Sequence, residues 1–222
     1  SKEVKISNGK PVVEVPMDTV LNIAMKKCRQ KLERIWSKYP FLIKRNIGEE
    51  SPEHIMGKAF IAYTLIKKLE DREVILKEDK KKNWDKIRKH WILSEIKVPG
   101  TDIRPDITFK ILGKEEYYEF ETLFEEGFVK IYEKLDKYNE YSLPVNIVVE
   151  PIAAVLHAKD GSANNFATLI AMIKNGQIYG NLQEKVRFYT LDLKNEKLMP
   201  IENYLKELRV WLSKVRRLEN LS

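Results

Sequence analysis

Three carboxylates in the middle of the chain are spaced so that they could share a divalent cation. Asp106 opens one short run of alternating apolar residues, and Glu119 and Glu121 stand two positions apart in the next such run. Because side chains alternate across a strand, both glutamates are expected on the same face. Carboxylates crowded on one face repel each other unless a cation lies among them, and hard oxygen ligands suit Mg²⁺ or Mn²⁺. The spacing therefore predicts a metal site.

The segments around these carboxylates predict a β-hairpin that would position them. Turn-forming residues at 112–115 separate the two runs, so residues 105–123 are expected to form an antiparallel hairpin. Pro105 is allowed at the first residue of a strand, which places Asp106 at the strand entrance. Ser51 and Pro52 then predict the start of a helix, with Ser51 as N-cap.

The apolar periodicity over the rest of the chain predicts a mixed α/β fold. Helices are expected at 18–38, from Ser51 to about 70, and at 124–138, 162–175 and 201–219; strands are expected at 73–78, 91–98, 146–149 and 185–193. We expect a single domain over 1–222, with a core at about 51–150, an N-terminal helical extension at 1–50 and a C-terminal α/β extension at 151–222.

The motif Pro105-Asp106, followed by Glu119-x-Glu121, resembles that of the PD-(D/E)XK nuclease superfamily. The expected order of helix, three strands, helix and strand also matches, over fewer than half of the residues. The resemblance implies a restriction-endonuclease-like core and a metal-dependent endonuclease acting on DNA. Archaeal Holliday-junction resolvases, which are small, basic, single-domain homodimers that act on branched DNA, are similar to this chain. A nuclease of crenarchaeal spindle-shaped viruses is similar to it in length and thermophile-like composition.

The resemblance also implies roles for individual residues. Asp106 and Glu119 would bind the metal ion, with Glu53 of the first core helix joining them, and Glu121 would complete the coordination or orient water as a base. The family usually has a lysine at the position of Glu121. In some members that lysine has moved to the following helix. Here Lys130, Lys134 and Lys137 recur along one face of the expected helix, and we select Lys134 as the catalytic cation. Nucleic-acid contacts are expected from Arg104, His54, Lys58 and Lys130.

Composition narrows the partners and the compartment. Forty Lys and Arg residues against 33 Asp and Glu give a net charge of +7, which fits either a polyanion-binding surface or an evenly charged solvated one. A single cysteine, Cys28, rules out an internal disulfide and a cysteine-rich zinc site. No apolar run approaches the roughly 20 residues that cross a membrane. We therefore expect an intracellular protein that binds DNA through its backbone, with no membrane partner.

Two alternatives fit the same residues. Glu121 in place of lysine also fits a catalytically inactive nucleic-acid-binding protein that keeps the nuclease fold, and an enzyme acting on RNA would need the same groups. Cleavage with Mg²⁺ or Mn²⁺, abolished by Asp106→Ala while binding survives, separates an enzyme from a binding protein. The sequence does not indicate whether branched, duplex or single-stranded substrates are preferred.

Overall fold

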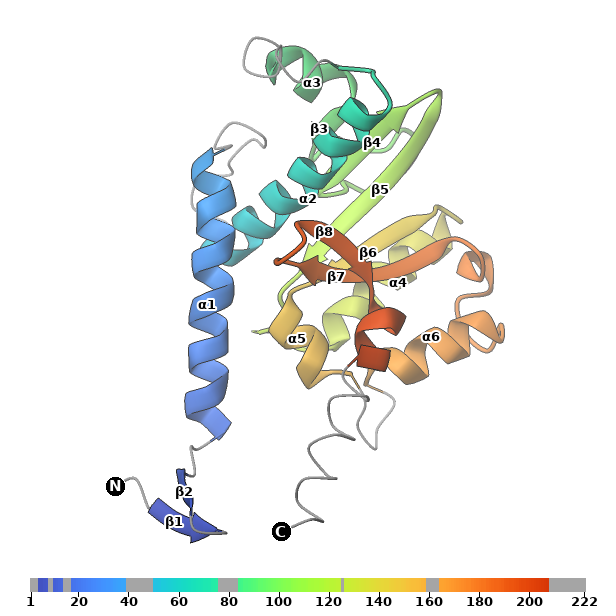
Figure 1. Ribbon diagram of the computed structural model, residues 1–222. Coiled ribbons are helices and arrows are strands. Elements are labelled where there is room, and N and C mark those ends of the chain that lie inside the picture. Colours follow the sequence, from blue (N-terminus) through green and yellow to red (C-terminus); the bar gives the residue numbers. More distant parts are fainter. Residues whose placement is uncertain are drawn as a thin grey trace.

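One six-stranded mixed sheet forms the centre of the molecule (Figure 1). The computed structural model describes residues 4–7, 10–13, 17–38, 50–75, 84–124, 126–158 and 164–207. The strands, in their order across the sheet, are β3 (Ile92–Ser94), β4 (Ile107–Ile111), β5 (Lys114–Glu121), β6 (Val145–Val149), β7 (Val186–Asp192) and β8 (Lys197–Pro200). β3, β4 and β5 are antiparallel neighbours, β5, β6 and β7 are parallel, and β8 is antiparallel to β7. The mixed α/β class predicted from the sequence is therefore confirmed.

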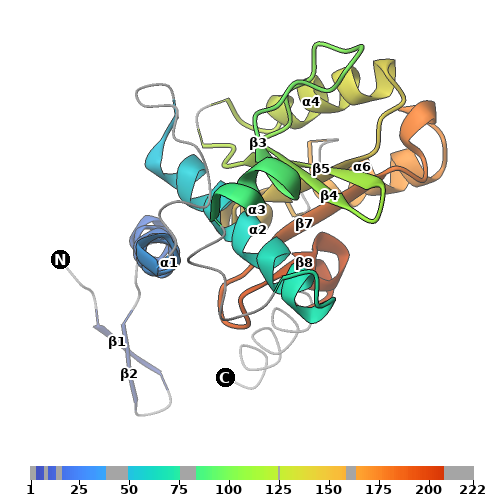
Figure 2. The same ribbon diagram turned by 90° about the horizontal axis from the view of Figure 1, so that it is seen from above.

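Helices cover both faces of this sheet (Figure 2). They are α1 (Met17–Lys38), α2 (Pro52–Asp71), α3 (Trp84–His90), α4 (Val129–Glu140), α5 (Pro151–Leu156), α6 (Phe166–Lys174) and the short 3-10 helix η2 (Gly180–Leu182). Seen from above, the hairpin strands lie between α2 on one side and α4 on the other. Two further strands, β1 (Val4–Ser7) and β2 (Lys10–Val13), pair only with each other. None of the helices described has the length and apolar character required to cross a membrane.

The predicted hairpin is present as β4 and β5. Its register pairs Ile107 with Tyr118 and Ile111 with Lys114, so the turn consists of Leu112 and Gly113. Both turn residues have positive φ, 50° and 74°, which suits the right-handed twist of the strands. This register fixes which face each side chain of β5 takes.

The start of α2 also follows the prediction. The side chain of Ser51 accepts the backbone N–H of His54, and Pro52 occupies the first helical position. Gly57 lets this helix approach the sheet closely, because a Cβ at that position would lie 2.1 Å from Cε1 of Phe120. The glycine thus holds α2 directly against β5.

Two hydrophobic clusters lie on opposite faces of β5. Phe120 and Tyr118 pack with α2 and with Leu32 and Ile35 of α1, whereas Tyr117 packs on the α4 side with β6, α5 and α6. Because alternate residues point to opposite faces, Glu119 and Glu121 share the face of Tyr117. The carboxylates therefore lie on the α4 side of the sheet.

Several element boundaries differ from the sequence predictions. The strand expected at 91–98 is limited to β3. The helix expected from 124 begins at Val129, because Leu123 has a φ of 60° and the described residues 122–124 and 126–128 are not helical. Residues 73–75 form a turn and bend instead of a strand, and the rest of that prediction, 76–78, lies outside the described residues. The last helix is described only as far as 207. The sequence reading missed α3, α5, β8 and the β1–β2 pair.

Candidate metal centre

Asp106 and Glu119 lie opposite each other at the entrance of the β4–β5 hairpin, as the register requires. Only 6% and 2% of their surfaces are exposed. The Asp106 carboxylate accepts the backbone N–H of Phe120 at 2.7 Å. Burial opposes its ionisation, but the hydrogen bond and charge of His54, with help from Lys134, hold the pKa of Asp106 below its ordinary value. Asp106 is therefore an ionised carboxylate at neutral pH.

Glu119 is held by two donors from α4. The hydroxyl of Tyr138 donates to Oε1 at 2.9 Å, and Nζ of Lys134 donates to Oε2 at 2.9 Å. Burial and the negative charge of Asp106 nevertheless raise the pKa of Glu119 to about 7. The environments thus separate the pKa values of the two facing carboxyl groups, so that one stays ionised while the other exchanges a proton near neutrality.

Lys134 also reaches Glu121, the second predicted carboxylate of β5. Its Nζ lies 3.5 Å from Oε1 of Glu121, whose pKa is raised mainly by burial. Burial disfavours the charged form of Lys134, but Glu119, Asp106 and Glu121 outweigh it and raise the pKa of the ammonium group. The structure therefore brings together four predicted residues, and the catalytic role of Lys134 stays a prediction.

Glu50 is a site residue that the sequence reading missed. It forms a cluster with His54 and Asp106. Each of the three residues offers one ligand atom, and these atoms lie within 4.8 Å of one another, close enough to hold a metal ion. Nδ1 of His54 is 3.3 Å from Oε1 of Glu50, and Nε2 is 3.3 Å from Oδ2 of Asp106. The four-residue spacing of Glu50 and His54, one helical turn, was a usable signal. The expected core, however, began one residue later, at Ser51.

Two other predicted residues are engaged differently from the expectation. Glu53 lines the pocket described below, but its Oε1 is 3.2 Å from Nη1 of Arg29, and it does not belong to the three-residue cluster. Lys58 has no exposed surface, and its Nζ lies 2.6 Å from Oε1 of Glu50 and 3.3 Å from Oε1 of Glu95. Lys58 is therefore withdrawn from any bound phosphate, because its charge neutralises buried carboxylates instead.

A pocket of about 500 Å³, the carboxylate pocket, opens over these groups between the start of α2, the end of β5 and α4. Its lining includes Glu50, Glu53, His54, Glu121, Lys130 and Lys134. An adjoining pocket of about 440 Å³ shares Lys130 and Lys134 and adds Glu119 and Arg104. Arg104 is exposed, and Lys130 pairs with Glu126 at 2.8 Å. Lys130 thus lies where a phosphate entering either pocket could meet it, and Arg104 lies where a phosphate entering the adjoining pocket could meet it.

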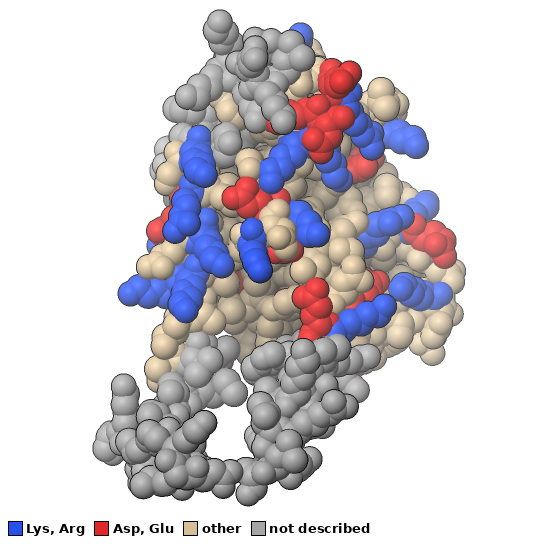
Figure 3. Space-filling view, in the orientation of Figure 1, with Lys and Arg blue, Asp and Glu red and all other residues tan. Residues whose placement is uncertain are grey.

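Basic side chains line the neighbouring helix α1 (Figure 3). Its exposed cations are Lys26, Lys27, Arg29, Lys31, Arg34 and Lys38, and among its described side chains Glu33 is the one acidic group. The ion pair between Arg29 and Glu53 brings this helix to the edge of the carboxylate pocket. The basic stretch at 80–82 lies outside the described residues.

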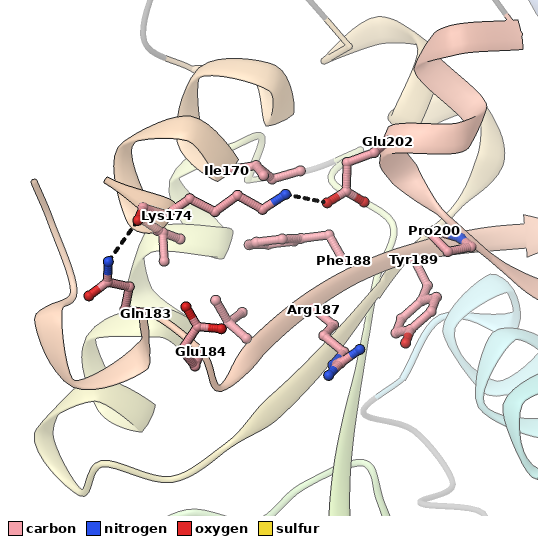
Figure 4. Close-up of a pocket in the computed structure, with 11 residues that line it drawn as sticks. Ile170, Lys174, Gln183, Glu184, Arg187, Phe188, Tyr189, Pro200 and Glu202 are labelled. Carbon is pink, nitrogen blue, oxygen red and sulfur yellow. Dashed lines mark hydrogen bonds and ion pairs between the residues drawn. The ribbon is translucent and has the colours of Figure 1, made fainter. Parts of the chain in front are cut away.

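Another pocket, of about 520 Å³, lies between α6, β7 and residues 200–202 (Figure 4). Two cations line it, Lys174 and Arg187, and Lys174 is paired with Glu202 at 3.3 Å. Within the described ranges, no His, Cys, Asp and Glu group of metal-binding geometry lies there. Titratable groups with shifted pKa values gather instead in the carboxylate pocket, which we take as the functional site.

Comparison with known proteins identifies no relative. No protein-family model, no curated protein and no solved structure matches this chain. The functional argument therefore depends on the geometry of the carboxylate pocket.

Proposed function

We propose that this chain is a divalent-metal-dependent nuclease of DNA with a restriction-endonuclease-like core. The order α2, then β3, β4 and β5, then α4 and β6, with the short helix α3 inserted between α2 and β3, supports this. Apart from that insertion it corresponds to the core order of the PD-(D/E)XK superfamily that the sequence resembles. The single observation that carries the proposal is the convergence of Asp106, Glu119, Glu121 and Lys134.

The donor set fits Mg²⁺ or Mn²⁺. Asp106, Glu119 and Glu121 offer hard carboxylate oxygens in a little-exposed setting, and one ammonium group leaves their charge incompletely neutralised. A buried oxygen of Glu50, Oε2, has no hydrogen-bond partner among the described residues. A bound divalent ion would lower the pKa of a coordinated water and polarise a phosphate.

The residues of the chain would divide the remaining work. Ionised Asp106 is ready to bind a cation at neutral pH. Glu119 would bind the cation beside Asp106, and Glu121 can orient an attacking water and accept its proton. Lys134 would place positive charge beside the phosphate as negative charge develops on it. In this way a lysine from α4 replaces the one that the superfamily usually carries at the position of Glu121.

The substrate of this proposal is DNA held through its backbone. The cations of α1, together with Arg104 and Lys130, surround the two pockets and would contact phosphates without reading sequence. A two-fold dimer would supply two pockets for symmetrical cuts in branched DNA. Because the contacts are between cations and phosphates, DNA binding should weaken steeply as the salt concentration rises.

The proposal is tested by incubating the purified chain with labelled duplex, single-stranded and four-way-junction DNA, and with RNA, in Mg²⁺ or Mn²⁺. We expect metal-dependent cleavage of at least one DNA substrate, and its loss by 100-fold or more, about 3 kcal/mol of activation free energy, in Asp106→Asn. Glu115→Gln is the matched control, because Glu115 is exposed at the far end of β5. Cleavage that survives in Asp106→Asn would contradict the proposal.

A second function, binding of nucleic acid without cleavage, is favoured by one observation. Lys134 already pairs with Glu119 and Glu121, so the chain itself neutralises part of the carboxylate charge. In that case the same panel should show salt-sensitive binding to DNA with no cleavage in either metal. Asp106→Asn would then leave the binding unchanged.

A further inference from the structure

The cluster of Glu50, His54 and Asp106 differs chemically from the carboxylates of β5. It contains an imidazole, and its three ligand atoms lie within 4.8 Å of one another. Glu50 lies just before α2, His54 lies in the first turn of that helix, and Asp106 directly precedes β4. Asp106 belongs to both groups, so the cluster lies beside the Glu119 position.

The ring of His54 is oriented as in metal-binding histidines. Nε2 lies 2.9 Å from the carbonyl oxygen of Phe120, and since a carbonyl only accepts, Nε2 carries the hydrogen in this contact. Histidine ligands usually donate their second ring N–H to a carbonyl or carboxylate, which fixes the tautomer. Nδ1 lies 3.3 Å from Oε1 of Glu50, and a metal ion that binds at Nδ1 replaces the proton that this nitrogen carries in the charged ring.

Glu50 adds an unused ligand atom. Its side chain is 10% exposed, and Oε1 accepts Nζ of Lys58 at 2.6 Å. Oε2 is buried and makes no hydrogen bond within the described part of the chain. A buried carboxylate oxygen without a donor is unfavourable, so this atom favours a site at which a cation binds.

The charge around the cluster favours a divalent ion despite the nearby ammonium groups. The connected ion pairs of this region contain five carboxylates and two ammonium groups. The acids are Glu50, Glu95, Asp106, Glu119 and Glu121, and the bases are Lys58, Lys134 and the imidazole of His54. This excess of negative charge in a region of low exposure is reduced when a divalent cation binds.

We propose that Glu50, His54 and Asp106 bind a transition-series divalent ion, with Mn²⁺ as the representative, and that the nitrogen of His54 makes the site discriminate against Mg²⁺. Mg²⁺ takes oxygen ligands at near-ideal octahedral geometry, whereas first-row transition ions accept imidazole readily. The inference deepens the proposed function, because it concerns the same pocket. It can nevertheless be measured without any nucleic acid.

The test is Mn²⁺ binding to the full chain, followed by electron paramagnetic resonance with Mg²⁺ as competitor. We expect Mn²⁺ to bind at least about tenfold more tightly than Mg²⁺, and the bound ion to show magnetic coupling to a nitrogen nucleus. His54→Gln should remove the nitrogen coupling and weaken Mn²⁺ binding at least about tenfold. His90→Gln, at an exposed histidine of α3, is the matched control and should change neither.

Glu50→Gln guards against a folding defect in the histidine variant. It should weaken Mn²⁺ binding while the nitrogen coupling of the ion still bound remains, and thermal unfolding checks that both variants fold. Bound Mn²⁺ without nitrogen coupling, or displacement by equal concentrations of Mg²⁺, would overturn the inference even if DNA is cleaved. Mn²⁺ bound with nitrogen coupling but no cleavage of any substrate would support it and refute the nuclease proposal alone.

Discussion

Replacing Lys134 by methionine should destabilise the fold, and more at high pH than at low pH. Nζ of Lys134 lies 2.9 Å from Oε2 of Glu119, whose side chain is 3% exposed. At an effective dielectric constant of about 20, unit charges at this distance attract each other by about 5–6 kcal/mol. A quarter of the Lys134 side chain is exposed, so solvent screening reduces the expected loss to about 3 kcal/mol, near the lower end for a buried pair that loses one partner.

The pH dependence of that loss follows from the carboxyl group left behind. The pKa of Glu119 is raised from 4.5 to about 7 in the folded protein, so its ionised form destabilises the fold as pH rises through that range. Removing Lys134 penalises the ionised form further. The loss should therefore be about 3 kcal/mol at pH 8.5. At pH 5 the loss should fall to about 1 kcal/mol, because Glu119 is then protonated and the remaining cost is that ionised Asp106 lacks the nearby positive charge of Lys134.

Urea unfolding at the two pH values measures both numbers. Lys137→Met, at an exposed lysine on the same helix, should change the free energy of unfolding by less than about 0.5 kcal/mol. Adding Glu119→Gln to Lys134→Met should recover about 2 kcal/mol at pH 8.5, because the uncompensated charge is gone. Equal losses at pH 5 and pH 8.5, or no recovery in the double variant, would refute the electrostatic reasoning.

Three further predictions concern the elements around the pocket. Burial raises the pKa of Glu150 from 4.5 to about 7, so the wild-type fold should lose roughly 3 kcal/mol between pH 4.5 and 8 through this group, and Glu150→Gln should remove that part of the loss in urea unfolding. Gly57→Ala should lower the free energy of unfolding by about 2–3 kcal/mol, because the new Cβ would overlap Phe120. The same substitution at an uncrowded helix position is stabilising, so thermal unfolding of the variant distinguishes the two cases by the direction of the change in stability. Tyr138→Phe should cost about 1–3 kcal/mol at pH 8, because Glu119 loses a buried donor, and less at pH 5; an equal cost at both would contradict this.

Much of the hairpin could be predicted because local chemistry decides it. The alternation around Glu119 and Glu121 and the turn at Gly113 each act over a few residues, and the structure has both as expected, whereas Pro105 and Asp106 precede β4, which begins at Ile107. The start of α2 is similarly local, since Ser51 caps it. Lys134 was selected from three lysines on the period of one helix, and that helix does deliver it to the carboxylates.

The rest depended on packing that no local pattern encodes. Lys58 looked like a surface cation, but α2 turns it toward Glu50 and Glu95, where burial and charge hold it. Glu53 stood at the expected helical position, yet α1 supplies Arg29 to pair with it. The short strand β8 was missed because its pairing with β7 forms only once the sheet exists.

The alternation of β5 has a consequence for how activity can be lost. Phe120 stands between Glu119 and Glu121 and is fully enclosed on the opposite face by the cluster that α2 completes. A substitution that loosens this enclosure would tilt the strand and change the spacing of the acidic groups without touching them. Genetic screens for lost activity should therefore recover apolar positions remote from any substrate, some of them as temperature-sensitive alleles, beside the acidic residues themselves.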